Sequence, residues 1–374
     1  METTIDRLEV YCGEKLVGTM APYRRYLTAF EYSAEWLQSG FSISPYSLPL
    51  EPGIRIAKAD PFDGLFGIFA DSLPDGWGRL LVDRMLRKEG KNPDEVDSIF
   101  RLSIVGSSGM GALEYRPVYH LRSGAEMPDL DRLAEECRKI LCAEEPDDLD
   151  TLFAFGGSSG GARPKAIVRT DGAEWIIKFP SVQDPENIGQ MEYEYNLCAE
   201  ACGICIPEVR LFPSREGPGY FGSRRFDRIF HENEVRKIHM ASVSALLETS
   251  HRVPALDYTS LMALTWQLTK QSKEVLKMFR LMCFNIFAHN RDDHSNNFSF
   301  LCEKGAWHLA PAYDLTYSNS IGGEHATTVA GEGRAPKMGD ILQVANKAGI
   351  SESAAKEIAG QVRETVNEKL GRYI

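Results

Sequence analysis

The chain has little of what nucleic-acid binding or membrane insertion requires. Its 374 residues carry 42 lysines and arginines against 53 aspartates and glutamates, a formal net charge of −11. Because phosphate contacts need clustered cationic side chains, this balance argues against nucleic-acid binding without a partner that supplies them. No stretch reaches the roughly 20 apolar residues of a membrane span. No apolar run follows a basic start, so we expect neither a membrane span nor a signal peptide.

Cysteine is also sparse in the patterns that metal or redox chemistry would use. Among eight cysteines, Cys202 and Cys205 form a C-x-x-C pair. Isoleucines flank this pair and no second pair completes a zinc site, so we interpret it as structural, with a redox pair as the alternative. Reduced, buried thiols are typical of the cytoplasm, where we expect the protein.

The length predicts two or three domains, and 43% hydrophobic residues can fill full-sized cores. The N-terminal part predicts a hairpin, an edge strand or loop with two prolines, and two amphipathic helices. The hairpin is expected at 8–11 with 16–20, the edge strand or loop at 41–50, and the helices at 80–88 and 130–141.

An acidic segment follows at 144–150. It could hold a metal, but no histidine or second cluster joins it, which favours a solvated linker.

A glycine-rich loop begins at residue 156. It has four glycines in six positions, and its sequence is Gly156-Gly157-Ser158-Ser159-Gly160-Gly161-Ala162-Arg163-Pro164-Lys165. Such a loop can direct several backbone N–H groups at phosphates. It is not a Walker A loop, because Lys165 follows a proline and a strand follows the loop. We expect a strand–loop–strand context. A second glycine-rich stretch, 106–111, has no lysine strand at hairpin distance, and we interpret it as a structural turn.

A lysine follows on the return strand of the next predicted hairpin. Asp171-Gly172 is a turn signal between strands 166–170 and 174–179, and the second strand carries Lys178 between apolar neighbours. A lysine there is costly unless paired. It could point to water at a sheet edge, but the adjoining loop favours a phosphate contact. Helix 190–202 offers Glu192 as the first choice of carboxylate partner, since Glu194 lies on another face.

The most informative segment lies further on, after helical sequence at 261–287. Asp292 and Asn297 have the D-x-x-x-x-N spacing of a kinase catalytic loop, where the aspartate accepts a hydroxyl proton and the asparagine holds magnesium. Asp314 follows a hairpin-like stretch, where kinases keep a second metal-binding aspartate. The alternative is a zinc or two-metal hydrolase site made by His289, Asp292, Asp293 and His294. That alternative leaves Lys178, Asn297 and Asp314 without a role.

Together these motifs resemble the HipA family of serine/threonine kinases, the toxins of type II toxin–antitoxin systems, over nearly the whole chain. The segments 69–79 (FADSLPDGWGR) and 105–115 are similar to its N-terminal coupling domain, and 158–165 to its phosphate loop. The strand at 176–180, the hinge at 225–228, the catalytic loop at 292–298, the metal site at 312–314 and the tail from 328 also match.

The resemblance implies an α+β, protein-kinase-like two-lobed fold with a β-rich N-lobe, a helical C-lobe and an N-terminal β-rich coupling subdomain. The expected domains are a coupling domain at 1–120, a kinase N-lobe at 121–226 and a helical C-lobe at 227–374.

The resemblance also implies roles for site residues. Asp292 would be the catalytic base, Asn297 and Asp314 would bind Mg²⁺, Glu192 would form the structural ion pair, and Ser158 would be autophosphorylated, with Ser159 as the alternative. The residues expected to contact ATP are Ser159, Gly160, Gly161, Ala162, Arg163, Lys165, Lys178, Arg224, Phe226, His294 and Tyr313.

The implied partners are a small helix-turn-helix, HipB-like antitoxin, operator DNA reached through it, and a protein substrate of the aminoacyl-tRNA synthetase class. A small-molecule phosphotransferase with the same core, and a pseudokinase or co-repressor acting through an antitoxin–DNA complex, are the alternatives. The chain departs from the family in its shorter length, in Arg224 where an acidic residue is expected, and in Asp293 where the residue is often small.

Overall fold

The computed structural model describes residues 4–24, 26–121, 129–158, 160–231, 234–250, 252–253 and 255–374. The chain divides into two units, each described here by itself. The first unit comprises the chain up to Gly189, together with Arg210–Ala241 and Ala245–Glu248. The second comprises Gln190–Val209, Ser242–Ser244 and Thr249–Ile374.

The first unit begins with a five-stranded sheet in the order β4-β3-β2-β1-β5. The predicted hairpin is its centre, since β1 and β2 pair antiparallel around Gly13. The strands are β1 Leu8–Cys12, β2 Lys15–Tyr23, β3 Leu27–Tyr32, β4 Arg55–Ile56 and β5 Leu113–Arg116. The helices of this part are α1 Ala34–Ser39, α2 Gly67–Ala70, α3 Gly76–Lys88 and α4 Ser98–Val105, with a 3₁₀ turn at Pro93–Glu95.

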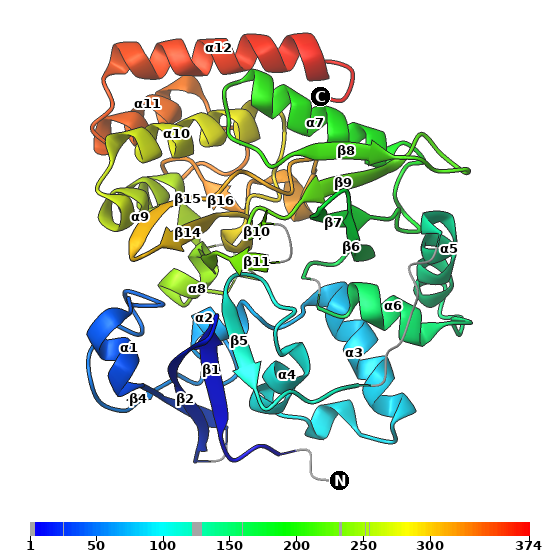
Figure 1. Ribbon diagram of the computed structural model, residues 1–374. Coiled ribbons are helices and arrows are strands. Elements are labelled where there is room, and N and C mark those ends of the chain that lie inside the picture. Colours follow the sequence, from blue (N-terminus) through cyan, green and yellow to red (C-terminus); the bar gives the residue numbers. More distant parts are fainter. Residues whose placement is uncertain are drawn as a thin grey trace. The chain divides into compact units, whose positions relative to one another are not determined.

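The second sheet of this unit has the order β6-β7-β9-β8 (Figure 1). Its strands are β6 Lys165–Thr170, β7 Ala173–Lys178, β8 Val209–Phe212 and β9 Tyr220–Arg224, and a hairpin of β10 Arg228–His231 and β11 Glu234–Lys237 follows. β12 (His239–Ser242) and α8 (Val243–Leu247) come next in the chain. β9 ends at Arg224, directly before the segment 225–228 that resembles the family's hinge.

The core of the second sheet includes a helix from the N-terminal part of the chain. Trp77 and Leu81 of α3 are buried with Val168 of β6 and Trp175 of β7. α5 (Leu130–Leu141) and α6 (Leu149–Gly156) complete this cluster. α5 has the bounds that its apolar spacing predicts.

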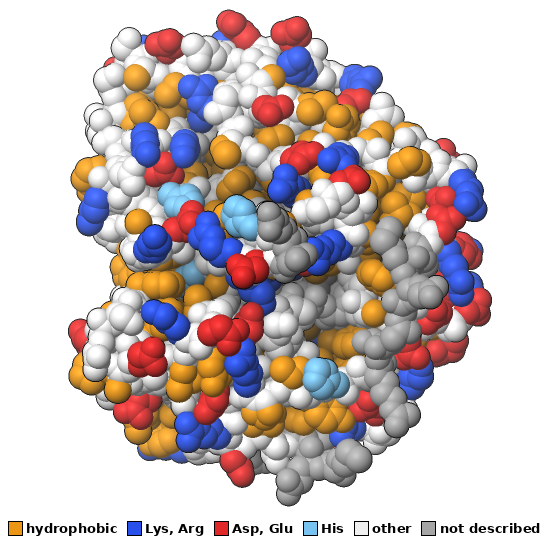
Figure 2. All heavy atoms as spheres, viewed as in Figure 1, with side chains coloured by type: hydrophobic (Ala, Val, Ile, Leu, Met, Phe, Trp, Pro, Cys, Tyr) orange, Lys and Arg blue, Asp and Glu red, His pale blue; other side chains and the backbone are white. Residues whose placement is uncertain are grey.

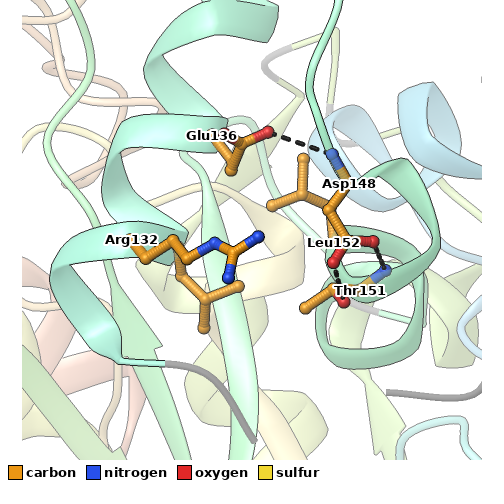
Figure 3. A pocket seen from close by; sticks show the side chains of 6 residues that line it. Arg132, Glu136, Asp148, Thr151 and Leu152 are labelled. Atoms are coloured by element: carbon orange, nitrogen blue, oxygen red, sulfur yellow. Dashed lines mark hydrogen bonds between the residues drawn. The ribbon is translucent and has the colours of Figure 1, made fainter. Parts of the chain in front are cut away.

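The acidic segment at 144–150 connects α5 to α6 as a capped turn (Figure 3). The carboxylate of Glu136 accepts hydrogen bonds from the backbone N–H groups of Asp147 and Asp148, at 2.6 and 3.3 Å. Asp148 in turn accepts from the backbone and hydroxyl of Thr151 in the first turn of α6. These carboxylates therefore satisfy backbone donors at a helix start.

The second unit is mainly helical. Its helices are α7 Ile188–Ala201, which begins two residues before the unit, α9 Tyr258–Thr269, α10 Ser272–Phe287, α11 Met338–Lys347 and α12 Glu352–Leu370. α12 packs on α10 and α11 (Figure 1). Between α10 and α11 the chain has no α-helix. It forms a hairpin of β14 Ser299–Glu303 and β15 Ala306–Leu309, 3₁₀ turns at Ser295–Asn297 and Ile321–Gly323, and the short strand β16 Thr327–Thr328. β16 pairs in parallel with β13 Leu256–Asp257, which lies before α9.

Candidate functional site

The glycine loop lies between α6 and β6, so a helix and not a strand precedes it. The expected strand–loop–strand context is wrong. Asp148 caps the helix, and Leu149, Leu152 and Phe153 have the i, i+3, i+4 spacing that packs it on the sheet. The loop residues Gly160, Gly161 and Ala162 are exposed and Ser158 is half-buried. Ser159 lies outside the described residues.

Residues of α3 hold the glycine loop in place. The backbone N–H of Trp77 donates to the carbonyl of Gly161 at 2.9 Å. Gly76 lies so close that an added Cβ would be 2.5 Å from the same oxygen, and both glycines have positive φ. Glycine at these two positions therefore permits a backbone contact that any side chain would obstruct.

Two lysines lie opposite each other beside this loop. The β6–β7 register pairs Lys165 with Lys178, so both side chains share one face of the hairpin. A Cβ at Gly161 would be 2.8 Å from the Nζ of Lys165, and the Nζ of Lys178 is 5.6 Å from the ring centroid of Phe221. The hairpin therefore carries two positive charges on one face, next to the glycine loop in the chain.

Arg163, Arg224 and Phe226 are further predicted ATP contacts of this unit. Arg163 forms an ion pair with Asp184 at 2.9 Å, so this arginine anchors the end of the loop to 181–184. Arg224 ends β9, where it pairs with Trp175, and Phe226 follows the strand half-buried.

A buried ionic cluster follows directly after β9. The side chains of Arg225, Asp227 and Arg228 are each at most 3% exposed. The two arginines donate to the carbonyls of Gly109 and Gly111 at 2.7–3.1 Å. Burial opposes ionisation of Asp227, but the charges and hydrogen bonds of both arginines outweigh it and lower the pKa of that carboxyl. The stretch 106–111 is thus a structural turn, as its sequence context predicts.

The second unit positions the predicted catalytic loop between α10 and β14. The carboxylate of Asp292 is 58% exposed and lies 3.7 Å from the Nε2 of His294. The Nδ2 of Asn297 donates to the backbone carbonyl of Asp292 at 2.7 Å. The Nδ1 of His294 accepts from the backbone N–H of Asn296. The D-x-x-x-x-N spacing therefore closes a compact turn that leaves the Asp292 carboxylate accessible.

The neighbouring aspartate has the opposite environment. Asp293 is buried, and its carboxylate accepts hydrogen bonds from the hydroxyl of Tyr258 and the backbone N–H of Thr327, with Nδ1 of His325 at 3.0 Å. A general base must be accessible to the substrate whose proton it takes. Asp292 is exposed and meets this condition, whereas Asp293 is buried and does not.

Asp314 follows β15 after the segment 310–313. Its φ is +57°, a left-handed backbone conformation that is uncommon outside glycine and frequent at functional sites. The hydroxyl of Tyr313 is hydrogen-bonded to Ser299 and to the carbonyl of Asn296, at 2.6 and 2.5 Å. Tyr313 therefore ties the segment before Asp314 to the catalytic loop.

The two glutamates of α7 differ in the way that their helical spacing predicts. Glu194 binds Arg372 and Tyr373 near the C-terminus and also accepts from Gln190. Glu192 is 2% exposed and on another face of the helix. The sequence did not indicate the C-terminal partners of Glu194.

The hydrolase alternative finds no support in the geometry. Asp293 and His294 already have the partners described above. In the part of the chain that the structure describes, no group of three or more His, Cys, Asp and Glu side chains could hold a metal ion.

The Cys202 thiol lies 3.9 Å from the carbonyl of Val362, while Cys205 is exposed. Among the described residues, no helix combines the length and apolar character that membrane crossing needs.

The class of protein follows from this architecture. A β-rich part that carries a glycine loop and a strand lysine, and a helical part that carries the D-x-x-x-x-N loop, are arranged along the chain as in protein kinases. The predicted α+β, kinase-like fold class is confirmed by a structural comparison. The HipA chain in a complex of Shewanella oneidensis HipA, HipB and operator DNA matches with a TM-score of 0.72. That match covers 98% of this chain and 90% of the other, at 17% identity.

The chain belongs to the HipA family. The model of the HipA-like C-terminal domain matches residues 157–370, and that of the HipA N-terminal domain matches residues 8–116. The Shewanella oneidensis serine/threonine-protein kinase toxin HipA is 21% identical over 82% of this chain and 74% of its own length. Y4mE of Sinorhizobium fredii, whose name places it among the kinases, is 25% identical over 90% and 80%. The predicted family and the assignment as a protein kinase are confirmed.

Proposed function

We propose that this chain is a Mg²⁺- and ATP-dependent serine/threonine kinase that acts as the toxin of a HipBA-like system in the cytoplasm. The observation that carries the proposal is the geometry of the catalytic loop. The side chain of Asn297 donates a hydrogen bond to the backbone carbonyl of Asp292, and the Asp292 carboxylate stays exposed. That arrangement suits a group that orients a hydroxyl and accepts its proton.

The first unit contributes the groups for the nucleotide. Lys165 and Lys178 present two positive charges on one hairpin face, beside the exposed glycines of the loop 157–163. Together they would neutralise and orient the ATP phosphates. The backbone at Arg224 and Phe226 would support the adenine base of ATP. The buried ionic cluster of Arg225, Asp227 and Arg228 holds this part of the chain in place.

The second unit contributes the metal ligands and the base. Asn297 and Asp314 offer an amide and a carboxylate oxygen, the hard ligands that Mg²⁺ prefers. The Oδ1 of Asn297 is its only atom that could bind Mg²⁺, and the hydrogen bond from Nδ2 to the carbonyl of Asp292 holds the amide in place. Bound Mg²⁺ would supply charge stabilisation for the transferred phosphoryl group. Asp292 would hold the attacking hydroxyl and take its proton, with His294 as a neighbour of the carboxylate.

The biological setting is proposed from the family. The structural relative is a HipA bound to HipB and operator DNA. By analogy, the expected partner is a small helix-turn-helix antitoxin, and the expected substrate class is an aminoacyl-tRNA synthetase.

Autophosphorylation of the glycine loop tests the proposal directly. A phosphate on Ser158 would add about −1.5 to −2 charge where the ATP phosphates should bind, which would expel the loop and weaken ATP binding. Mass spectrometry after incubation with ATP and Mg²⁺ should find phosphate on Ser158, and little on an Asp292→Gln variant.

Separate Ser158→Ala and Ser159→Ala variants show which serine is used. Phosphate found only outside 156–165 would refute this switch.

A further inference from the structure

Asp293 follows the proposed catalytic base directly in the chain, and its side chain is the centre of a buried hydrogen-bond network. Its side chain is fully buried and binds groups from two other segments of the chain. The hydroxyl of Tyr258 at the start of α9 donates to Oδ2 at 2.7 Å. The backbone N–H of Thr327 in β16 donates to Oδ1 at 3.2 Å, and Nδ1 of His325 lies 3.0 Å from Oδ2. The hydroxyl of Thr327 also donates to the backbone carbonyl of Asp293.

The residues 325–333, here called the clasp segment, hold the catalytic loop at further points. The backbone N–H of Ala326 donates to the carbonyl of Arg291 at 3.1 Å. The N–H of His325 donates to the carbonyl of Gly333, which closes the segment on itself. Its other side is fixed to the start of α9, since Thr327 and Thr328 pair in parallel with Leu256 and Asp257.

Behind the loop the network continues into α10. The Nδ2 of Asn285 donates to the hydroxyl of Tyr258, and the Nδ2 of Asn290 donates to the Oδ1 of Asn285. Burial, and next the charge of Asp293, raise the pKa of the Tyr258 hydroxyl well above its usual value, so this group remains a donor.

A buried carboxylate is tolerated only where its hydrogen bonds are made, so this network specifies one position for the backbone of residue 293. That backbone is covalently joined to Asp292. Any shift of Asp293 that breaks its bonds therefore moves the exposed carboxylate of Asp292.

We propose that Asp293 is a positioning residue, which fixes the Asp292 carboxylate by anchoring the catalytic loop to the clasp segment and to Tyr258. This inference rests on the proposed role of Asp292. Loss of the anchor should slow the chemical step more than it weakens nucleotide binding, because the proposed phosphate-binding lysines belong to the other unit. A misplacement of about 1 Å in a catalytic group costs about 100-fold in rate.

The test compares Asp293→Asn and Tyr258→Phe with Tyr115→Phe. The asparagine keeps the size of the side chain but presents an amide where two donors converge. Tyr258→Phe removes the hydroxyl, and with it the hydrogen bonds to Asp293 and Asn285, but keeps the ring. Tyr115→Phe is the matched control, because Tyr115 of β5 is fully buried, donates to Ser72 at 2.7 Å and belongs to the first unit.

We expect kcat to fall between about 10- and 100-fold in Asp293→Asn, and less in Tyr258→Phe, with a smaller change in the KM for ATP. Hydrogen exchange of the amides in 289–297 and 325–333 should accelerate in both, while α12 keeps its protection. Tyr115→Phe should lower the melting temperature and leave kcat and the exchange of 289–297 unchanged.

A wild-type kcat in Asp293→Asn, or unchanged exchange at 289–297, would overturn the proposal. An Asp292→Asn variant separates this failure from failure of the proposed function. If Asp292→Asn retains full turnover, the assigned base is wrong, and the exchange data still decide whether Asp293 anchors the loop.

Discussion

Asp292 and Asp293 are chemically identical side chains with opposite environments. One carboxylate is 58% exposed and the other is fully buried. The spacing to Asn297 selects Asp292 in the sequence. The partners of Asp293 could not be predicted in this way, because Tyr258 and His325 lie more than thirty residues away on either side and no local pattern links them.

The position of Lys165 opposite Lys178 could be predicted from the sequence. A two-residue Asp171-Gly172 turn fixes the register of a hairpin, and counting back from it places Lys165 opposite Lys178. Both turn residues have the positive φ that this turn type requires. Their shared face is visible in the sequence once the turn is recognised.

At the same scale we predict the effect of removing the proposed metal ligands. Asn297→Ala and Asp314→Asn should each lower Mg²⁺-dependent phosphotransfer by about 100-fold or more, because the first removes an oxygen ligand and the second removes the negative charge that would hold the cation. ATP with Mg²⁺ should raise the melting temperature of the wild type and not that of Asp314→Asn, since a ligand stabilises the state it binds.

The matched control for Asn297→Ala is Asn346→Ala on the exposed side of α11. Normal phosphotransfer by both ligand variants would refute the metal assignment.

At the scale of elements, the strongest periodic patterns were reliable and the irregular segments were not. The hairpin β1–β2 and the helices α5, α9 and α10 follow from alternation or from 3.6-residue spacing. The helix before the glycine loop was missed, although Asp148 is an N-cap and the apolar residues of 149–153 have helical spacing. Its glycine-rich end concealed the pattern.

Strand β12 carries a histidine that makes stability depend on pH. His239 is buried against Phe41, with Nε2 2.8 Å from the carbonyl of Ile43. Burial lowers the pKa of its imidazole to about 4, against about 6.5 in an unfolded chain. The unfolded state therefore binds the proton first, and stability is lost as the pH falls from about 6.5 to about 4. The loss amounts to about 3 kcal/mol.

A His239→Gln variant, whose amide can still donate to Ile43, should lose less stability over that interval. Urea unfolding at pH 7, 5.5 and 4.5 measures the difference. Parallel pH profiles for the two proteins would contradict the assignment.

At the scale of the molecule, each of the two units is built from several separate segments of the chain. The N-terminal helix α3 contributes Trp77 and Leu81 to the core of the sheet that carries Lys178. Hydrophobic periodicity shows that a helix has a buried face but not which sheet covers it. The domain boundaries at 120 and 226 therefore stay a prediction.

The charge of the whole chain leads to a prediction about operator DNA. The net charge is −11, and lysine and arginine side chains on the face in Figure 2 are interspersed with acidic ones. The protein alone should show no specific operator binding at physiological salt. With a small basic helix-turn-helix antitoxin it should join a complex on a palindromic site, and an Asp292→Gln variant should join equally well.

Gel-shift assays at two salt concentrations, with each component alone and with both, test this. Tight, salt-resistant operator binding by this chain by itself would contradict it.

The central claim is that this chain transfers phosphate from ATP with Asp292 as its base. The most direct measurement incubates the wild type, Asp292→Asn and the exposed control Asp94→Asn with γ-labelled ATP and Mg²⁺, and follows label bound to protein. The account predicts labelling by the wild type and by Asp94→Asn, and a loss of about 100-fold or more in Asp292→Asn. Equal labelling by Asp292→Asn, with its fold intact, would contradict it.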